Sequence, residues 1–547
     1  MFKLKPLNHT IRILSALTLS AIINGCSDSN SVESSDIQKF NVSGSIVGLN
    51  GSVTLKNGND PDMTLRLDGD ISIAKDIPTG TTYNIQVTTQ PDNQFCEVIN
   101  GSGIVTENIN NIQINCNEVL FITANDNSLG GNYELWATAG TPASTYKVKE
   151  INPNGSSVSF DQIYTSFNGK HYFSADNGSL GRELWRTDGT EDGTILIKNI
   201  NVANGNLSST PSVMNVVGNK MVFYAFTDTQ GTVSHSMDEF ENVSFLSNRT
   251  IYENNVLFDN KLLFESFSLT LSEAVIHTTD GITLEEKLFN SNYAFSPARI
   301  TLVDNKLFYF TFNNGGNVSL WVTEADGSSS PIELKTFSGI SSNRVVDDTE
   351  MQVVSFQGKL FFSADDSNGG YTLWKSDGTV SGTQKVKDLD NSLAPTEVIG
   401  LRVLNNQLIF QARGTAAGLW SSDGTDAGTT KLSAAILQLG NFHGVSYPVI
   451  ANNKYFYQAN DSVNGNELWV SDGTSSGTKM VKNINPTGDS FPLNLISRNG
   501  YILFGASASD EQGFELWRSD GTENGTTLVK EFCLDSECSG FAGPPAG

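Results

Sequence analysis

The stretch GNELWVSDGTSSGT, residues 465–478, decides the fold because close copies of it recur along the chain. GRELWRTDGTEDGT occupies residues 181–194, and GFELWRSDGTENGT occupies residues 513–526. In each copy a strand-like run ends in Ser/Thr-Asp-Gly-Thr, and Asp-Gly supplies residues that tolerate the positive φ of a tight turn. We interpret the stretch as a strand followed by a turn, with the second Gly-Thr as the far corner of that turn.

Every tryptophan of the chain lies in such a unit, and two further units carry a histidine in its place. The tryptophans are Trp136, Trp185, Trp321, Trp374, Trp420, Trp469 and Trp517, and the histidines are His235 and His277. These nine positions are 42–53 residues apart, and a full unit contains four short β-like runs. That period is typical of a β-propeller blade, whereas the units of a solenoid are usually shorter. The sequence therefore predicts an all-β fold with a multi-bladed propeller of eight or nine four-stranded units.

The aspartates and tryptophans of the repeat are interpreted as structural residues. The aspartates are Asp188, Asp377, Asp423, Asp472 and Asp520. One aromatic side chain per unit is expected to pack between neighbouring blades, where it removes a large area from water. The first unit, ELWATAGTPAST, lacks the aspartate, and the two histidine units lack the tryptophan. We expect those three units to be looser or to present a different face.

The phrase resembles the ELWxxDGT repeat of bacterial secreted and envelope proteins, and the resemblance covers residues 118 to about 532. The resemblance implies a β-propeller and assigns no biochemical activity.

The N-terminus has the features of a lipoprotein signal peptide over residues 1–25. The apolar run Ile13–Ile23 is too short to span a bilayer. The IINGC that follows resembles the lipobox of bacterial lipoproteins, which implies a lipid on Cys26 and a membrane-bound tether over residues 26–37. Ser27 then favours transport to the outer membrane. We therefore expect a lipid-anchored protein of the bacterial cell envelope.

Residues 38–117 alternate apolar and polar side chains with period two, which predicts a small β-sandwich. Four cysteines follow the lipobox, namely Cys96, Cys116, Cys533 and Cys538. An even number behind a signal peptide indicates disulfides, and near-neighbour pairing is the simplest of three connectivities. A zinc site is the alternative. Residues 533–547 are expected to form a disulfide-tied, flexible tail.

The sandwich segment resembles an immunoglobulin-like module of bacterial envelope lipoproteins. In that module a QPxxQxC loop is tied by a disulfide to a cysteine on the last strand. The resemblance places this loop at Gln90, Pro91, Gln94 and Cys96, with Cys116 as the partner. It implies a spacer or stalk.

The net charge of −25 argues against nucleic acid as a partner, because binding to phosphates needs a basic surface. The acidity fits solubility or a cation-binding surface. Loops before the tryptophan strands supply weak calcium candidates, namely Asp126, Asp176, Asp365 and Asp461, although they lack the D-x-D-x-D-G spacing. Ordinary turns explain the same residues. No other cofactor is expected.

No catalytic motif is evident in the sequence. Glu134, Glu183, Glu467 and Glu515 recur two residues before a tryptophan, where they could line a rim or supply a glycosidase pair. A residue that recurs with the repeat is better explained by a structural role, because catalysis needs a single asymmetric site. His171, His235, His277 and His443 form no recognisable triad or metal motif and are interpreted as packing residues.

These observations lead to a main functional hypothesis and two alternatives. The main hypothesis is a non-enzymatic binding lipoprotein that contacts an envelope protein or polysaccharide through propeller loops. The first alternative is a glycan-active hydrolase or lyase on a propeller scaffold. The second is a structural component of an envelope assembly.

Overall fold

The computed structural model describes most of the chain in fourteen stretches. They are residues 37–125, 132–160, 162–202, 207–251, 255–268, 273–291, 298–312, 317–337, 353–365, 371–389, 398–412, 414–435, 447–509 and 513–532. The described residues form strands and one 3₁₀ turn, Gly414–Ala416. The prediction of an all-β protein is thus confirmed. Within these stretches no helix has the length and apolar character needed to cross a membrane.

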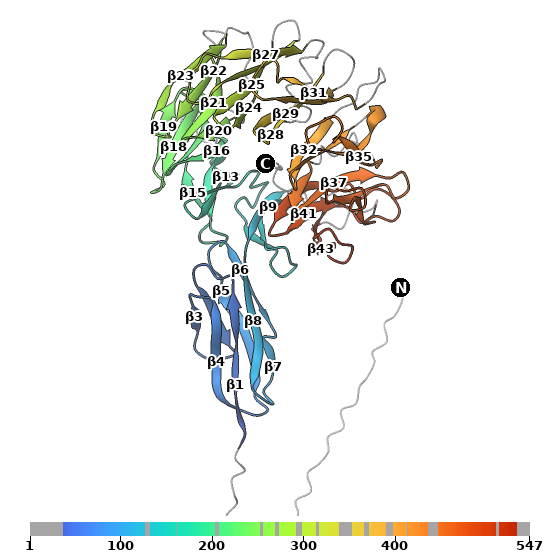
Figure 1. The fold of residues 1–547 in the computed structure, drawn as a ribbon. Helices are drawn as coiled ribbons and strands as arrows, with labels where there is room; N and C mark the ends of the chain where they lie inside the picture. The colour runs from blue at the N-terminus through green and yellow to red at the C-terminus, as the bar shows by residue number, and fades with distance from the viewer. Residues whose placement is uncertain are drawn as a thin grey trace, which may run out of the picture.

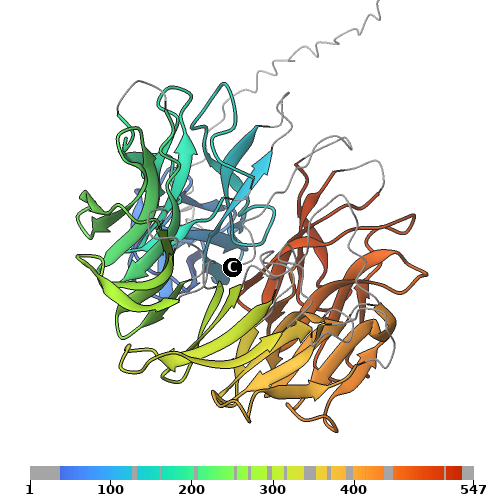
Figure 2. The same ribbon diagram turned by 90° about the horizontal axis from the view of Figure 1, so that it is seen from above.

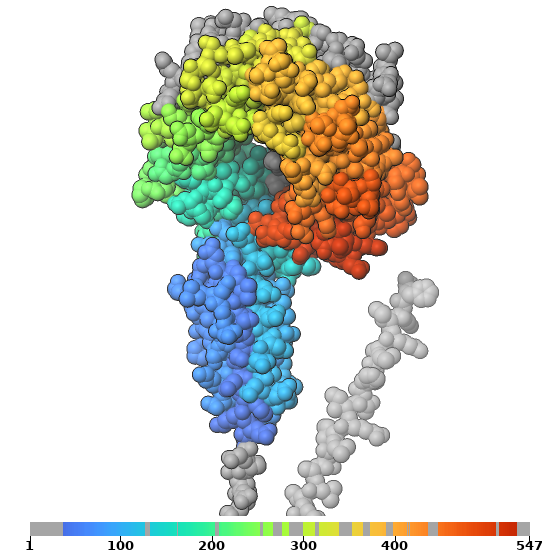
Figure 3. All heavy atoms as spheres, viewed as in Figure 1, coloured from blue at the N-terminus to red at the C-terminus, as the bar shows by residue number. Residues whose placement is uncertain are grey.

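The first eight strands build two four-stranded sheets that enclose one apolar core. One sheet has the order β4-β1-β8-β6, with β4 (Gly69–Pro78), β1 (Lys39–Val47), β8 (Ile109–Glu118) and β6 (Gln94–Ile99). The other has the order β3-β2-β5-β7, with β3 (Met63–Leu65), β2 (Val53–Asn57), β5 (Thr82–Thr89) and β7 (Ser102–Ile104). Val42, Val53 and Ile114 are fully buried between the two sheets. This sandwich projects as a narrow body from one end of the repeats (Figure 3).

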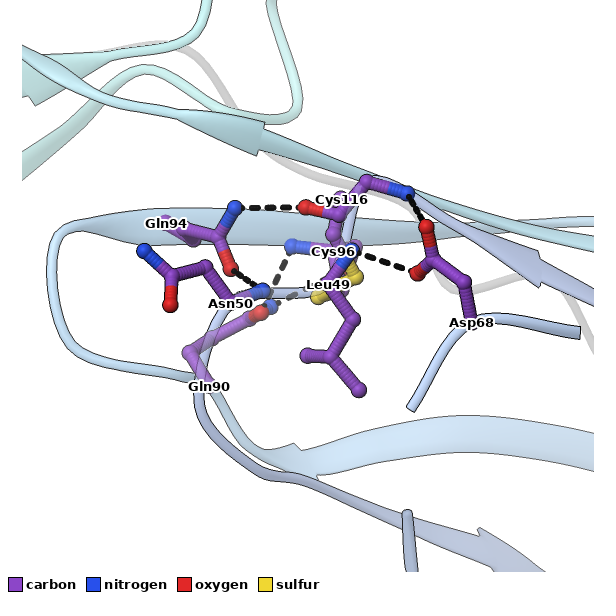
Figure 4. Close-up of a disulfide and its surroundings, with 8 residues drawn as sticks. Leu49, Asn50, Asp68, Gln90, Gln94, Cys96 and Cys116 are labelled. Carbon is purple, nitrogen blue, oxygen red and sulfur yellow. Dashed lines mark hydrogen bonds between the residues drawn. A yellow bond between two sulfur atoms is a disulfide. The ribbon is translucent and has the colours of Figure 1, made fainter. Parts of the chain in front are cut away.

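A disulfide joins Cys96 to Cys116 across paired strands of the sandwich, as near-neighbour pairing predicts (Figure 4). The loop before Cys96 is fixed by two glutamines. The Gln90 side chain accepts from the Cys96 N–H at 2.7 Å and donates to the Cys96 carbonyl at 3.2 Å. Gln94 donates to the Gly48 carbonyl at 2.7 Å and accepts from the Asn50 N–H at 2.8 Å. The QPxxQxC pattern therefore serves to order this end of the sandwich.

In the described stretches that follow, the chain forms nine small antiparallel sheets, one for each unit of the repeat, and we number them in chain order. The first has three strands, namely β9 (Leu120–Asn125), β10 (Tyr133–Thr138) and β11 (Tyr146–Lys149). The second to fifth are β12 (Thr165–Phe167), β13 (Lys170–Asp176), β14 (Arg182–Thr187), β15 (Ile195–Lys198); β16 (Ser212–Val217), β17 (Lys220–Thr227), β18 (Gly231–Asp238), β19 (Val243–Ser247); β20 (Asn255–Phe258), β21 (Lys261–Ser268), β22 (Glu273–Thr279), β23 (Leu284–Ser291); β24 (Ala298–Val303), β25 (Lys306–Phe312), β26 (Val318–Glu324), β27 (Ile332–Phe337). The sixth to ninth are β28 (Val353–Phe356), β29 (Lys359–Asp365), β30 (Tyr371–Ser376), β31 (Gln384–Lys387); β32 (Val398–Leu404), β33 (Gln407–Ala412), β34 (Gly418–Ser422), β35 (Thr430–Ser433); β36 (Val449–Ala451), β37 (Lys454–Asn460), β38 (Asn466–Ser471), β39 (Lys479–Lys482); β40 (Leu493–Arg498), β41 (Tyr501–Ala506), β42 (Glu515–Ser519), β43 (Thr527–Lys530).

The strands of each four-stranded sheet follow chain order, and the sheets succeed one another around a common centre (Figures 1 and 2). First strands of neighbouring sheets contact one another, for example β24 with β28 and β36 with β40. The first strand of a sheet is therefore its inner strand, and the tryptophan lies on the third.

The repeated aromatic residue packs against the preceding sheet. Trp517 of the ninth sheet shares a cluster with Phe456 and Val481 of the eighth. Six of the seven tryptophans are at most 9% exposed. Cross-strand pairing places both histidines in the equivalent register, since His235 pairs with Phe223 as Trp517 pairs with Phe504. The tryptophan or histidine therefore pairs with the equivalent residue of the second strand in these sheets.

The last sheet packs on the first, and we call this contact the seam. Trp136 lies edge-on to Phe532, with ring centroids 5.0 Å apart. The Tyr501 hydroxyl donates to the Ala139 carbonyl at 3.0 Å, and the Lys530 ammonium lies 5.7 Å from the Trp136 ring centroid. These contacts bring together residues about 400 positions apart in sequence.

Inner strands alternate between two forms around the repeats. β16, β24, β32 and β40 have six or seven residues and a β-bulge, whereas β12, β20, β28 and β36 have three or four. Each bulge contains a residue with positive φ, and these are Val213, Arg299, Gly400 and Asn494. At Gly400 an added Cβ would lie 2.6 Å from the Tyr455 hydroxyl, so only glycine fits there. The sheets therefore come in pairs, which the sequence analysis did not predict.

Candidate functional site

The repeated turn is held by the carboxylate of its aspartate. In the ninth sheet Asp520 Oδ1 accepts from the Thr522 N–H at 2.8 Å and from the Thr522 hydroxyl at 2.7 Å. The same hydroxyl accepts from the Gly525 N–H at 3.0 Å. Ser519 and Thr526 close the base of the turn through their hydroxyl groups, 2.8 Å apart. The whole SDGTxxGT phrase is thus one hydrogen-bonded unit.

The network recurs in all five complete copies. The threonine hydroxyl lies 2.7 Å from the aspartate Oδ1 in each, for Asp188, Asp377, Asp423, Asp472 and Asp520. These bonds favour the charged carboxylate, because donors directed at it stabilise the anion. The Thr522 hydroxyl accordingly holds the pKa of Asp520 below its ordinary value, and the Thr474 hydroxyl does the same for the pKa of Asp472.

The second glycine of the phrase is required by the carboxylate itself. A Cβ added at Gly525 would lie 2.1 Å from Asp520 Oδ1, and the other four copies show the same conflict. The first sheet lacks both residues, with Ala139 and Ser144 in their places. There the Ser144 hydroxyl accepts from the Ala139 N–H at 3.1 Å and from the Thr141 N–H at 3.0 Å. A serine from the far corner has replaced the carboxylate, so this turn is held as firmly as the others.

Each turn also receives hydrogen bonds from the preceding sheet. Lys306 donates to the Asp377 carbonyl at 3.0 Å, and Lys454 donates to the Asp520 carbonyl at 3.0 Å. Outer-strand lysines reach the far corner in the same way, as Lys482 does to the Thr526 carbonyl at 2.9 Å. Sequence analysis missed these lysines, although a Val-Lys pair near the end of the first, sixth, eighth and ninth units was a usable signal for those on the outer strands. The turn is therefore the element through which neighbouring sheets recognise one another.

The recurring glutamates bind the chain segment that leads to the next sheet. Glu467 accepts from the Ile484 N–H at 2.9 Å and from the Ser490 hydroxyl at 2.7 Å. Glu183 accepts from the Ile200 N–H at 2.7 Å and from the Ser209 hydroxyl at 2.6 Å. Glu134 binds the Ser157 hydroxyl, and Glu515 binds the Phe532 N–H. The serine partners were missed, although INPNGSS and INPTGDS repeat ahead of the second and ninth sheets.

The proposed rim or channel position of these glutamates is wrong, because all four are at most 2% exposed. Burial raises the pKa of Glu134 to about 8 and that of Glu467 to about 7, since desolvation disfavours the charged form. A raised pKa often marks a general acid, but these carboxyl groups have no access to a substrate. They are structural, and they do not form a glycosidase pair.

The calcium candidates are dispersed among the turns. Asp461 accepts from the Val463 and Asn464 N–H groups at 2.9 and 2.8 Å, and Asp176 accepts from the Gly178 N–H at 2.7 Å. Asp365 ends β29, and Asp126 lies outside the described residues. Where the chain is described, no three His, Cys, Asp or Glu side chains group as metal ligands. Asp176 and Asp461 act as turn residues.

The three described histidines are packed against aromatic rings. His235 stacks on Phe223 with ring centroids 5.6 Å apart, and His277 lies 5.9 Å from Phe264. The His171 ring lies 4.7 Å from that of Phe121, and burial lowers the pKa of His171 to about 4. His443, Cys26, Cys533 and Cys538 lie outside the described residues.

Comparisons with known proteins give structural similarity alone. No family model and no curated protein matches the chain. A puromycin hydrolase crystal structure matches with 12% identity and a TM-score of 0.34, over 59% of this chain and 54% of that one. Prolyl oligopeptidase B from Galerina marginata matches with 11% identity and a TM-score of 0.40, over 69% of this chain and 50% of the other. A prolyl endopeptidase structure also matches, with 10% identity and a TM-score of 0.36, over 68% of this chain and 50% of the other.

The matched region spans about half the length of those peptidase chains. The hypothesis of a non-enzymatic binding module is corrected by this finding, because the similar solved structures belong to hydrolases. They are nearer to the first alternative, a glycan-active hydrolase or lyase on a propeller scaffold, although the proteins that they name are peptidases. Similarity at this level transfers neither catalytic residues nor a substrate.

Asp520 and Gly525 can be replaced by the residues that stand in their places in the first sheet, alanine and serine, and this gives a stability prediction. Asp520→Ala removes the acceptor of the turn, and Gly525→Ser forces a side chain onto the carboxylate. Each single change should lower the free energy of unfolding by about 1–3 kcal/mol. The double variant recreates the Ala139–Ser144 arrangement and should recover at least half of the summed loss. Urea denaturation measures the cycle, and strictly additive losses would contradict the exchange.

The buried carboxyl of Glu134 predicts a pH dependence. Its pKa is about 8 in the folded chain and 4.5 as the ordinary value, so the folded state keeps a proton that the unfolded state loses. Stability from this group is fully present below about pH 4.5 and is lost as pH rises through 8. The wild-type unfolding free energy should fall over this window by less than about 1.4 kcal/mol per pH unit for this group. Glu134→Gln should flatten that slope, and an unchanged slope in the variant would refute the assignment.

Proposed function

We propose that the chain is a hydrolase on a propeller scaffold that acts on polymers of the bacterial cell envelope. In this proposal the nine sheets close into one propeller through the seam. The closed ring provides a rigid frame, and residues that depart from the repeat provide the reacting groups.

The observation that carries the proposal is how the repeat uses its polar side chains. Asp520 and its equivalents hold turns, the lysines cross to the next sheet, and Glu467 and its equivalents bind connecting segments. All of these groups act on the protein itself. Catalysis needs groups that touch a substrate, so in this proposal the repeated side chains build the scaffold and the reacting groups lie outside the repeated positions.

Attachment to the envelope completes the proposal. We place a lipid on Cys26 and take residues 27–37 as the tether that leads to the sandwich. Two or more acyl chains anchor a protein firmly, whereas one binds only marginally. The chain would belong to the ELWxxDGT-repeat proteins that its repeated phrase resembles.

The anchor is tested by labelling growing cells with an alkyne analogue of palmitate. The wild-type chain should carry the label and sediment with membranes. Cys26→Ser should lose the label and remain unprocessed, while Ser27→Ala should keep both properties. Equal labelling of the Cys26→Ser variant would exclude Cys26 as the modified residue.

Hydrolysis is tested on the purified full chain and on the complex that it forms in crosslinked envelope membranes. Each sample is incubated with fluorogenic peptides and with envelope polysaccharides. We expect turnover by the chain alone. Turnover only by a complex that contains a separate hydrolase, or by neither sample, would overturn the proposal.

A further inference from the structure

The sandwich runs directly into the first sheet of the repeats. The β6–β8 ladder ends with Gln94 opposite Glu118, and β9 begins two residues later. The Val119 N–H between them donates to the Asn93 carbonyl at 2.9 Å. The sandwich ladder is therefore continued by one further bond at the root of the first sheet.

Asn93 occupies the place that an inner strand fills elsewhere. In every four-stranded sheet the last residue of the inner strand pairs with the first residue of the second, as Ala451 pairs with Lys454. The first sheet is built from β9, β10 and β11 and has no strand in that place. Asn93 pairs with Val119 there and has a φ of 56°, close to the 55° of the turn residue Asn453.

The same residue makes the contact by which one sheet holds the turn of the next. Its N–H donates to the Asp188 carbonyl at 2.7 Å, the atom equivalent to the Asp520 carbonyl that Lys454 binds. Its Nδ2 donates to the Gly169 carbonyl at 2.6 Å, in the inner turn of the second sheet. Asn93 of the sandwich thus makes the contact to the second sheet that a residue of the preceding sheet makes elsewhere in the repeat.

The sandwich also reaches the far side of the seam. Glu118 forms an ion pair with Arg498 at the end of the inner strand β40, with an N–O distance of 3.0 Å. Phe95 lies against Tyr146 of the first sheet, with ring centroids 6.2 Å apart. Contacts from one short region of the sandwich therefore extend to the first, second and ninth sheets.

We propose that the sandwich is the clasp of the repeat region, in which Asn93 replaces the missing inner turn and ties the first sheet to the second, while Glu118 reaches across the seam to Arg498. The Cys96–Cys116 disulfide pins β6 to β8 two residues from the Gln94–Glu118 pair, so it fixes the clasp at its base. This inference rests on the junction alone and does not depend on the proposed hydrolytic role.

Hydrogen exchange followed by mass spectrometry tests the clasp in the full chain. Asn93→Ala removes the Nδ2 donor and strains the left-handed backbone. Asn100→Ala is its matched control, because Asn100 also has a positive φ of 58° and donates through Nδ2 to a carbonyl, that of Asn111, at the other end of β6. We expect Asn93→Ala to accelerate exchange of amides in β9, β12, β13 and β14 roughly tenfold, because its bonds end beside these strands.

The control should leave those amides unchanged and affect the sandwich alone. Acceleration that is confined to residues 37–118 in both variants would overturn the clasp. If Asn93→Ala fails to accumulate as folded protein, Asn93→Gly is compared with Asn100→Gly, because glycine keeps the left-handed backbone and lacks the amide. Reduction of the disulfide in folded wild-type protein should accelerate the same four strands, and unchanged exchange there would count against the clasp.

Discussion

The repeat region depends on one interaction, which recurs in the five complete copies of the turn. In each copy the aspartate carboxylate accepts hydrogen bonds from the N–H and the hydroxyl of one threonine. These bonds fold the phrase after the tryptophan strand into a fixed shape and present its carbonyl groups outward. A lysine from the preceding sheet then finds a carbonyl at a defined place, as Lys454 finds that of Asp520. The tryptophan on the same strand meets the preceding sheet beside this contact. Sheet-to-sheet packing is thus specified by a polar contact at the turn, while apolar burial supplies most of the free energy.

The same use of polar side chains explains why the repeated residues contact other parts of the protein. A residue that recurs in each sheet meets the same surroundings each time, and here those surroundings are protein. The recurring glutamates illustrate this point, because they lie at the positions that would have suited a pair of carboxylates and yet each is buried beneath a connecting segment. A reactive site on this fold needs residues that depart from the repeat. The described departures, Ser144 and the two histidines, repair the repeat or fill its core.

Sequence reasoning reached the features that are local or periodic. The period of about 48 residues, the strand-and-turn phrase, the packing role of the tryptophan and the alternation of the sandwich all follow from near neighbours along the chain. Residues whose partners lie far away were missed, such as Asn93, which meets the second sheet, and Lys454, which meets the ninth. Ser144 was missed for a different reason. Its role appears only when the missing aspartate and the missing glycine are considered together, because one side chain can occupy the space of the other. The alternating bulges gave no composition signal, since Val213, Arg299, Gly400 and Asn494 share no chemistry.

The third and fourth sheets show why the ends of such an array must be held. There a histidine replaces the tryptophan, so less apolar area is buried at two successive interfaces, although His235 stacks on Phe223. In a repeat structure each sheet contacts only its neighbours, so a weak interface in an open array lets the two parts separate. In a closed array the same opening also has to strain the other interfaces or break the seam. A well-packed seam therefore offsets weak interfaces in the interior. Trp136, Tyr501 and Arg498 supply aromatic, polar and ionic contacts at this seam, the last of them to Glu118 of the sandwich.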